Sequence, residues 1–459
     1  MEDTIKQELI AIVGADNFTD KPIDLVVFSY DSSENMSRPE CAVWPTTSEQ
    51  VSEILKLANR EKIAVTPRGA GTSLAGSAVP IRQGIVMDLA RMNKILQISI
   101  EDRLAIVQPG VVYEDLDRLL KKEGYFFPPD PGSGKVCTLG GNVATNAGGV
   151  KGAKYGTTRD YVLGLQVVLP DGRMMRVGTK TMKTSSGLDL ARLFVGSEGS
   201  LGVVTEIILK INPVPTFSRA ALATFDKLED AGNAIAQIMR SGVVPSVLEI
   251  LDVYTIRAIN QNTDLDLPEV AALLLAETDG YTVEDTMIQM EKVIQCFNAN
   301  NVGEIKTAES EKEKEELWKA RKSAYAVLAR IQTHFVLEDV TVPISNVPAL
   351  LRGIEEISQR YDLKIATFGH AGDGNLHPQI LYDGYDEDQV QRMEKACADL
   401  FKLCVDLDGT LSGEHGIGLS KAPYMHLEHD AVAMEMMGKI KKLFDPNNIL
   451  NPGKMALEV

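Results

Sequence analysis

The sequence predicts an α+β protein of two domains, and three observations carry this prediction. The chain has 459 residues, about three times the usual single-domain length of roughly 150. Short strand and helix patterns alternate from Pro45 to Ile211, with glycine-rich loops between them. A stiff connector at 212–215 (NPVP) separates this half from a second series of strands and helices. We therefore expect one domain at 1–215 and another at 216–459.

The elements of the first domain follow from hydrophobic periodicity. In chain order we expect a helix over 48–60, strands over 64–66, 84–89 and 104–108, and a helix over 113–123. Short strands that alternate with helices and glycine loops are typical of an α/β or α+β domain.

The second domain begins with a strand, a helix, two strands and a helix, an order that resembles a ferredoxin-like α+β unit. The expected ranges are 220–225, 228–241, 247–251, 270–277 and 283–299. A long helix over 311–332, a second strand-helix-strand set over 335–381 and two closing helices follow, the last over 431–444.

Composition excludes several classes of protein. The net charge is 47 − 64 = −17, a field that repels phosphate backbones and anionic lipids, so we expect no nucleic-acid partner. No apolar run reaches the roughly 18 residues of a membrane span, and the start is acidic where a signal peptide is basic. We expect a soluble, cytoplasmic protein. Five cysteines without a CxxC pair predict reduced thiols and no iron–sulfur site.

The stretch 64–76 (AVTPRGAGTSLAG) is a strand that enters a loop with three glycines. Such a loop directs backbone N–H groups at an anion, and a pyrophosphate is the natural ligand. A nicotinamide-binding turn is the rival, because Asp88 ends another strand about 20 residues on. That turn must open at once into a helix, which 77–84 with its Pro80 cannot form. A purely structural tight loop remains open.

Two further glycine segments, 131–149 and 196–204, suggest an extended dinucleotide across three loops. The order of PRGAGTSLAG, TLGGNVATNAGG and GSEGSLGVVTEI resembles the FAD-linked oxidases of the vanillyl-alcohol oxidase and p-cresol methylhydroxylase (PCMH) type, and the closing DPNNILNPGK at 445–454 resembles their terminal signature. The resemblance implies a PCMH-type FAD-binding domain and then a substrate (cap) domain with a C-terminal helical segment. Its last ~50 residues would return to the flavin.

The resemblance also implies which residues bind FAD. They are Arg68, Gly69, Gly71, Thr72, Ser73, Gly140, Gly141, Thr145, Gly148, Gly149, Glu198, Gly202 and Val204. Some relatives bond the flavin to histidine, but the first histidine here is His334, so we expect non-covalent FAD. Cys137 stands near a position where a few relatives form a cysteinyl bond, and we expect it to be a packing residue.

Three of the six histidines lie in two glycine-bracketed stretches, 368–378 (FGHAGDGNLHP) and 412–418 (SGEHGIG). His370 and His377 flank a tight loop, so both rings could converge on one ion with Glu414 as an oxygen ligand. Two imidazoles and a carboxylate leave positions open, as catalytic ions require. The alternative is that the rings cap turns or bond carbonyl groups.

These stretches resemble one branch of the family, the glycolate oxidase flavin subunit and the D-2-hydroxyacid dehydrogenases, including a lactate dehydrogenase subunit that pairs with electron-transferring flavoprotein. The resemblance implies a divalent ion (Zn²⁺, Fe²⁺ or Mn²⁺) on His370, His377 and Glu414, and a base at His415. The chemistry agrees, because a chelated 2-hydroxy acid has an acidified hydroxyl and a neutral imidazole of pKa about 6.5 can accept its proton. Hydride then leaves Cα for the flavin N5.

Arg321 fits the arginine of this branch that binds the substrate carboxylate, a task suited to a planar guanidinium. The alternative is a surface arginine paired with Glu315 or Glu316. Relatives that act on hydroxyglutarate carry a lysine before an Asp-x-x-x-Pro segment, where this chain has 337–343 (LEDVTVP). A second substrate carboxylate would lack a partner, which favours lactate or glycolate.

The expected function is FAD-dependent oxidation of a D-2-hydroxy acid, D-lactate first, to the 2-keto acid. Because no second redox centre is visible, electrons should pass to a partner such as electron-transferring flavoprotein. The alternatives are glycolate or another 2-hydroxy acid with an iron–sulfur subunit as acceptor, a metal-free alcohol oxidase of the same fold, and a non-catalytic subunit that relays electrons. A homodimer is compatible with the sequence.

Overall fold

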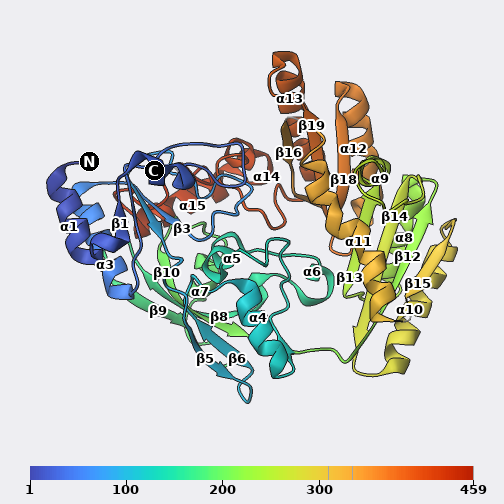
Figure 1. Ribbon diagram of the computed structural model, residues 1–459, viewed down its shortest axis with the longest axis horizontal. Helices are drawn as coiled ribbons and strands as arrows, with labels where there is room; N and C mark the ends of the chain where they lie inside the picture. Colours follow the sequence, from blue (N-terminus) through green and yellow to red (C-terminus); the bar gives the residue numbers. More distant parts are fainter. Residues whose placement is uncertain (309, 333, 458–459) are drawn as a thin grey trace. The chain divides into compact units, whose positions relative to one another are not determined.

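A computed structural model gives the structure of residues 1–308, 310–332 and 334–457 (Figure 1). The chain forms two compact units: unit 1 comprises 1–148, 157–214 and 414–459, and unit 2 comprises 149–156 and 215–413. The change at Val214 and Pro215 falls in the proline connector. The segment 149–156 belongs to unit 2, where the Lys154 ammonium donates 2.8 Å to the Asp279 carbonyl.

Unit 1 is assembled from short elements. They are α1 (Asp3–Val13), η1 (Ala15–Asn17), β1 (Phe18–Thr19), α2 (Pro22–Leu25), η2 (Val26–Phe28), β2 (Cys41–Val43), α3 (Ser48–Glu61), β3 (Val65–Arg68), β4 (Ile85–Asp88), β5 (Ile95–Ser99), β6 (Leu104–Val107), α4 (Tyr113–Lys122), β7 (Tyr125–Phe126), α5 (Leu139–Thr145), η3 (Thr158–Asp160), β8 (Val162–Val168), β9 (Met174–Gly178), α7 (Leu190–Phe194), β10 (Val203–Lys210), β11 (Asn212–Pro213), η5 (Ala422–Tyr424), α14 (Met425–Glu428) and α15 (Ala431–Phe444).

Unit 1 holds a four-stranded sheet, β1-β2-β4-β3, and a five-stranded antiparallel sheet, β5-β6-β10-β8-β9. Helix α3 and α1 pack on the smaller sheet through fully buried aliphatic side chains such as Ile54 and Leu55. The C-terminal segment adds to the edge of this sheet, because the Val65 N–H donates 2.7 Å to the Ile449 carbonyl and the Asn451 N–H donates 2.8 Å to the Val65 carbonyl. The chain's end is therefore built against the strand that leads into the first glycine loop.

Unit 2 is one large sheet with helices on both faces (Figure 1). Its elements are α6 (Gly152–Tyr155), β12 (Phe217–Phe225), α8 (Leu228–Arg240), β13 (Val247–Asp252), α9 (Val253–Asn262), β14 (Ala272–Gly280), α10 (Val283–Asn298), β15 (Ile305–Ala308), α11 (Glu311–Leu328), β16 (His334–Leu337), β17 (Val340–Thr341), η4 (Ile344–Asn346), α12 (Val347–Tyr361), β18 (Lys364–His370), β19 (Asn375–Tyr382) and α13 (Glu387–Asp406). The strand order is β15-β12-β14-β13-β18-β19-β16, with β17 also paired to β19.

Helices α8, α10, α12 and α13 cover one face of this sheet, and α9 and α11 cover the other. Alternate residues of a strand face opposite sides, so Leu251 and Phe368 of the α9/α11 core share their face with Glu249 and His370. The ionisable side chains of Glu249 and His370 thus lie on the face beneath α9 and α11, at the edge of its apolar core.

The α+β prediction is confirmed, and among the differences in detail three lie in unit 2. Helix α9 is absent from the predicted order and stands between two expected strands. Helix α11 ends at Leu328, four residues before the predicted end. Strand β15 at the sheet edge is also absent from the prediction. Helix α15 has the predicted bounds.

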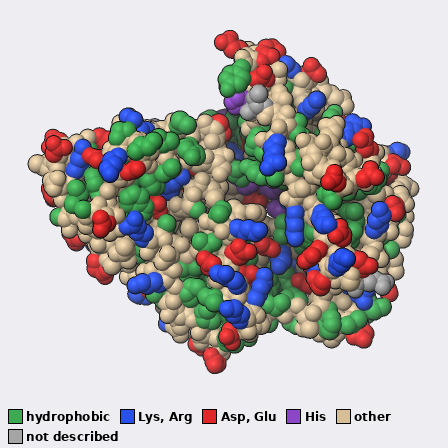
Figure 2. Space-filling view, in the orientation of Figure 1, with side chains coloured by type: hydrophobic (Ala, Val, Ile, Leu, Met, Phe, Trp, Pro, Cys, Tyr) green, Lys and Arg blue, Asp and Glu red, His purple; other side chains and the backbone are tan. Residues whose placement is uncertain are grey.

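The surface and the cysteines agree with the composition. Acidic and basic side chains are interspersed on the face drawn in Figure 2. Among the described residues, no helix is both long and apolar enough to cross a membrane. All five cysteines are buried and none forms a disulfide. Burial raises the pKa of the Cys137 thiol, as expected of a packing residue.

Candidate functional site

The first glycine loop leaves β3 at Arg68 and lies against the second. A Cβ at Gly69 would lie 2.3 Å from Thr138 Oγ1 and 3.8 Å from the Gly141 backbone nitrogen. Gly71 has φ +70°, in the left-handed region that favours glycine. The two loops therefore approach each other around the Thr138 hydroxyl, and Gly69, Gly71 and Gly141 remain half exposed.

Adjacent glycines of the second loop have different surroundings. The Gly140 N–H donates 2.8 Å to the Pro109 carbonyl, and a Cβ at Gly140 would lie 2.5 Å from Pro109 Cβ. A Cβ at Gly141 would meet only Thr138 Oγ1, at 3.3 Å, among the described residues outside its own helix. Gly140 is required by packing within the protein, whereas Gly141 faces open space beside the first loop.

The Arg68 side chain turns away from this open space. Its Nη1 donates to the carbonyls of Tyr30 (2.8 Å) and Ala78 (3.4 Å), and its Nη2 donates to that of Val27 (3.1 Å). Arg68 is 8% exposed. It was predicted among the FAD contacts, and its hydrogen bonds make it a brace that holds two backbone segments, 27–30 and the one at Ala78, around the loop.

The other residues predicted to bind FAD lie around the same loops or support them. Ser73 Oγ accepts 3.3 Å hydrogen bonds from two N–H groups of its own loop. Thr145 Oγ1 donates 3.3 Å to the Gly141 carbonyl. A Cβ at Gly202 would lie 2.5 Å from a Val167 methyl group, so this glycine allows strand packing. The remaining ones are Thr72, Gly148, Gly149 and Val204, all buried or half buried.

Glu198 is a buried anchor between two loops of unit 1. Its carboxylate accepts hydrogen bonds from Ser77 Oγ (2.6 Å), the Ile417 N–H (2.7 Å) and the Gly418 N–H (2.9 Å). Burial raises its pKa, and these donors moderate the rise. Glu198 therefore fixes the segment that follows His415 to the end of the first glycine loop.

These observations test whether unit 1 fits FAD. The cradle is backbone in closely packed loops, with Gly141 at its open side, and a pyrophosphate needs such close, side-chain-free N–H groups. The residues present fit the group.

In unit 2, Glu249 of β13 joins two of the predicted site residues. Its Oε1 lies 2.6 Å from His370 Nδ1, and its Oε2 accepts a hydrogen bond from Arg321 Nε. Burial would raise the pKa of Glu249, but the charge of Arg321 and the contact with His370 outweigh burial and lower it. Arg321 is therefore not the surface arginine of the alternative, which paired it with Glu315 or Glu316.

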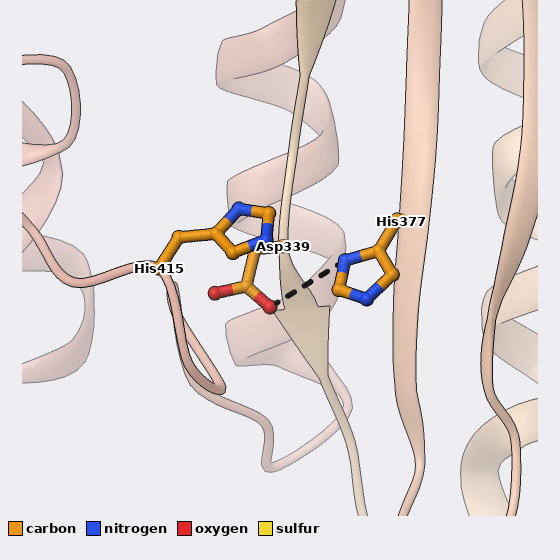
Figure 3. A group of neighbouring side chains, drawn as sticks. All are labelled: Asp339, His377 and His415. Carbon is orange, nitrogen blue, oxygen red and sulfur yellow. Dashed lines mark ion pairs between the residues drawn. The ribbon is translucent and has the colours of Figure 1, made fainter. Parts of the chain in front are cut away.

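His377 of β19 has a carboxylate of its own. Asp339, in the turn between β16 and β17, points its Oδ1 toward His377 Nδ1 at 3.7 Å (Figure 3). The ring centroids of His370 and His377 lie 5.0 Å apart, almost perpendicular, and a ring nitrogen of one lies within 4.8 Å of a ring nitrogen of the other. Each histidine thus faces a buried carboxylate through Nδ1, His370 at hydrogen-bond distance and His377 at ion-pair distance.

The start of the segment 412–415 is hydrogen-bonded to the same aspartate, Asp339. Ser412 Oγ donates 2.7 Å to Asp339 Oδ2, and the Gly413 N–H donates 3.3 Å to the Asp339 carbonyl. Gly413 ends this part of unit 2, and Glu414 opens the last part of unit 1. His415 Nε2 lies 4.0 Å from Glu414 Oε1.

These contacts test whether the residues fit a divalent ion. Metal-bound histidines almost always donate their second ring N–H to a carboxylate or carbonyl, which fixes the tautomer and leaves the other nitrogen for the ion. His370 with Glu249 has this arrangement, and His377 Nδ1 faces the Asp339 carboxylate at the longer, ion-pair distance of 3.7 Å. The two histidines fit a metal site.

Sequence reasoning missed Glu249, and it used Asp339 only as part of a spacing pattern. Glu249 lies in a strand among apolar residues more than one hundred positions before His370, so no local motif marks it. Gln379 was also missed. It is fully buried two residues after His377, and its amide has no hydrogen-bond partner among the described residues.

Comparison with known proteins decides the family. Residues 39–178 match the model of the FAD binding domain, and residues 214–455 match that of the FAD linked oxidases, C-terminal domain. The chain belongs to the FAD-linked oxidases. It is 41% identical to the glycolate oxidase subunit GlcD of Bacillus subtilis, over 98% of this chain and 96% of that protein.

Other members of the family are similar along most of their length. The D-lactate dehydrogenase of Archaeoglobus fulgidus is 37% identical, over 94% of this chain and 95% of that protein. The structure of p-cresol methylhydroxylase superposes with a TM-score of 0.84 at 19% identity, over 99% of this chain and 96% of that one. The PCMH-type fold and the family resemblance read from the glycine motifs are confirmed. This FAD-linked oxidase is an FAD-dependent oxidoreductase.

Proposed function

We propose that this FAD-linked oxidase is a D-2-hydroxyacid dehydrogenase whose preferred substrate is D-lactate, oxidised to the 2-keto acid. The observation that carries the proposal is the pair of carboxylate-held histidines beside an arginine in unit 2. Relatives named glycolate oxidase subunit and D-lactate dehydrogenase support the substrate class.

Each side chain has a role in this proposal. Arg321 binds the substrate carboxylate through its terminal nitrogens, since its Nε is used by Glu249. His370, His377 and Glu414 hold a divalent ion (Zn²⁺, Fe²⁺ or Mn²⁺), which supplies Lewis-acid polarisation of the substrate hydroxyl when bound. Glu414 directly follows Gly413, whose N–H is bonded to the same Asp339 that holds His377.

His415 is the proposed general base. It accepts the hydroxyl proton while Cα gives up hydride, so the substrate loses two electrons and two hydrogens as its C–O bond becomes a carbonyl. FAD, when bound by the glycine loops, supplies the two-electron acceptor. His415 is held in place because Glu198 accepts hydrogen bonds from the backbone N–H groups of Ile417 and Gly418, two and three residues further along the chain.

The proposal extends to electron acceptor, assembly and location. We propose that the electrons leave to a partner, electron-transferring flavoprotein, since the five cysteines are buried and lack the spacing of an iron–sulfur motif. We further propose a cytoplasmic protein, with a homodimer as the assembly to test by light scattering.

Glycolate is the second candidate substrate, with an iron–sulfur subunit as acceptor. It is favoured by relatives named glycolate oxidase subunit, at 41% identity in Bacillus subtilis and 38% in Escherichia coli. A metal-free alcohol oxidase of the same fold leaves the two histidine–carboxylate pairs without a purpose.

Anaerobic reduction of the bound flavin tests the proposal. D-lactate should bleach the flavin within the turnover time, and L-lactate should not. Faster bleaching by glycolate than by D-lactate would make glycolate the preferred substrate. Exhaustive chelation should abolish bleaching while FAD stays bound, since the proposed ion contacts the substrate and does not hold the FAD. A chelated protein that still reduces its flavin at the original rate would refute the metal role.

A further inference from the structure

Glu249 occupies a central place in the sheet of unit 2. It lies on β13, which has β14 on one side and β18 on the other, and its side chain is 1% exposed. A carboxylate in such a place is costly unless its charge is paired and its oxygens are hydrogen-bonded. Glu249 meets both conditions by means of two side chains that the proposed function uses.

The two oxygens of Glu249 serve different partners. Oε1 contacts His370 Nδ1 at 2.6 Å, and Oε2 accepts from Arg321 Nε. The Arg321 guanidinium also stacks over the Phe368 ring, with Cζ 4.8 Å from the ring centroid. The carboxylate and this ring hold the guanidinium from two sides.

We propose that Glu249 is the positioning residue that organises the metal-binding and the substrate-binding side chains together. An acceptor at Nδ1 places the proton of His370 there, so that Nε2 keeps its lone pair for an ion. The same carboxylate orients the guanidinium so that its two terminal nitrogens face a substrate carboxylate. This inference rests on the proposed metal-assisted oxidation of a 2-hydroxy acid.

Glu249→Gln separates this role from simple packing, because a glutamine has nearly the same shape but only one accepting oxygen. Arg321 carries a permanent charge and takes that oxygen. The amide N–H₂ then faces His370 Nδ1 and donates to it, which moves the ring proton to Nε2. The variant should therefore keep its fold but lose the lone pair that an ion needs.

Glu277 offers a matched control one strand away on β14. It is half-buried, and its Oε2 accepts 3.0 Å from Trp318 Nε1, one turn before Arg321 on α11. Glutamine can accept this hydrogen bond equally well. Glu277→Gln thus makes the same chemical change beneath the same helix without touching His370 or Arg321.

The experiment titrates Mn²⁺ and then oxalate into the FAD-loaded protein and measures both affinities by calorimetry, with no turnover involved. Glu249→Gln should bind Mn²⁺ about 10- to 100-fold more weakly. Oxalate should bind about 5- to 10-fold more weakly to the Mn²⁺-saturated variant, since a neutral amide oxygen orients the Arg321 guanidinium less firmly than a carboxylate does. Glu277→Gln should match wild type in both affinities.

Glu249→Asp, run in parallel, keeps the charge but shortens the side chain by one methylene and should weaken Mn²⁺ binding as well. If Glu249→Gln does not fold, this second variant decides. Mn²⁺ affinity within twofold of wild type in the folded variant overturns the inference while leaving the proposed function intact. An effect on Mn²⁺ but none on oxalate overturns the joint role. Wild type that binds no divalent ion overturns the proposed function and this inference together.

Discussion

The two units build their sites from different parts of the polypeptide. In unit 1 the cradle is mainly backbone, since Gly69 and Gly141 let two loops approach each other around the Thr138 hydroxyl. In unit 2 the site is made of side chains held in pairs, Glu249 with His370 and Asp339 with His377. A backbone site requires glycine at fixed positions, whereas a side-chain site requires partners that the fold brings from distant strands.

The difference determines how each site can be damaged. A side chain added at Gly141 would point into open space, because outside its own helix Thr138 Oγ1 is the only atom near it among the described residues, so the change acts on the ligand and not on the fold. A change at Glu249 acts through other side chains and removes a function without filling any space. Unit 1 should therefore fail by loss of binding, and unit 2 by loss of chemistry with FAD still bound.

The largest expected effect is the loss of FAD from Gly141→Leu. The leucine would occupy the place where backbone N–H groups approach the pyrophosphate, so the purified variant should be colourless and inactive. Absorbance of the flavin and thermal unfolding of the apoprotein measure the two parts of this claim. Wild-type flavin content would contradict the assignment of the cradle.

The control for this change is Gly438→Leu in α15, where a Cβ would have no heavy atom within 4 Å among the described residues. This substitution adds the same side chain to unit 1 away from the cradle. It should leave flavin content unchanged. Equal loss of flavin from both variants would mean that leucine disturbs the unit as a whole.

The next effect concerns the rate of flavin reduction. His415→Asn should lower that rate by about 10² to 10⁴-fold, the usual contribution of a general base. FAD content and Mn²⁺ affinity should be retained, because His415 is proposed as neither a cofactor nor a metal ligand. The wild-type rate should fall below a pH of roughly 6 to 7, where an imidazole takes up a proton, and the variant should lack this acid limb.

Stopped-flow reduction by D-lactate across this pH range separates the outcomes. A rate within a fewfold of wild type would assign the base role to another group. Loss of Mn²⁺ together with the rate would make His415 a ligand.

The fold was predictable where residues close in sequence determine the local structure by themselves. Helix α15 has its predicted bounds because Asp430 caps it, its Oδ1 accepting 2.8 Å from the Ala433 N–H. Helix α9 was missed because it follows β13 with no intervening loop. Asp252 both ends the strand and caps the helix, so no turn signal separates the two.

The site was predictable only in part, for a similar reason. Glycine motifs and clustered histidines are local in sequence, and they indicated both the cradle and the His370 and His377 pair. Their partners come from other strands, and a single glutamate such as Glu249 in an apolar strand has no spacing that relates it to a histidine of β18. Strand order, which periodicity does not determine, is what brings them together.

The same strand shows how partners decide the state of a buried carboxylate. Glu249 has Arg321 and His370 beside it, and its pKa is lowered. Asp252, three residues on, receives only backbone and hydroxyl hydrogen bonds, among them 2.8 Å contacts from the Thr255 and Thr367 N–H groups. Burial therefore prevails there and raises the pKa of Asp252 to about 6.

The smallest expected effect follows from this raised pKa. Between pH of about 4 and 6 the folded protein holds a proton on Asp252 that the unfolded chain has released, so stability from this group is present at low pH and is lost as pH rises through about 6. The loss amounts to roughly 1 to 3 kcal/mol.

Asp252→Asn carries no such proton. It should be less stable than wild type at pH 5, because its amide cannot accept from both N–H groups, and the deficit should shrink toward pH 7. Urea unfolding midpoints of both proteins across this range measure the difference, and a deficit that stays constant or grows with pH would mean that Asp252 is ionised in the fold like its neighbour Glu249.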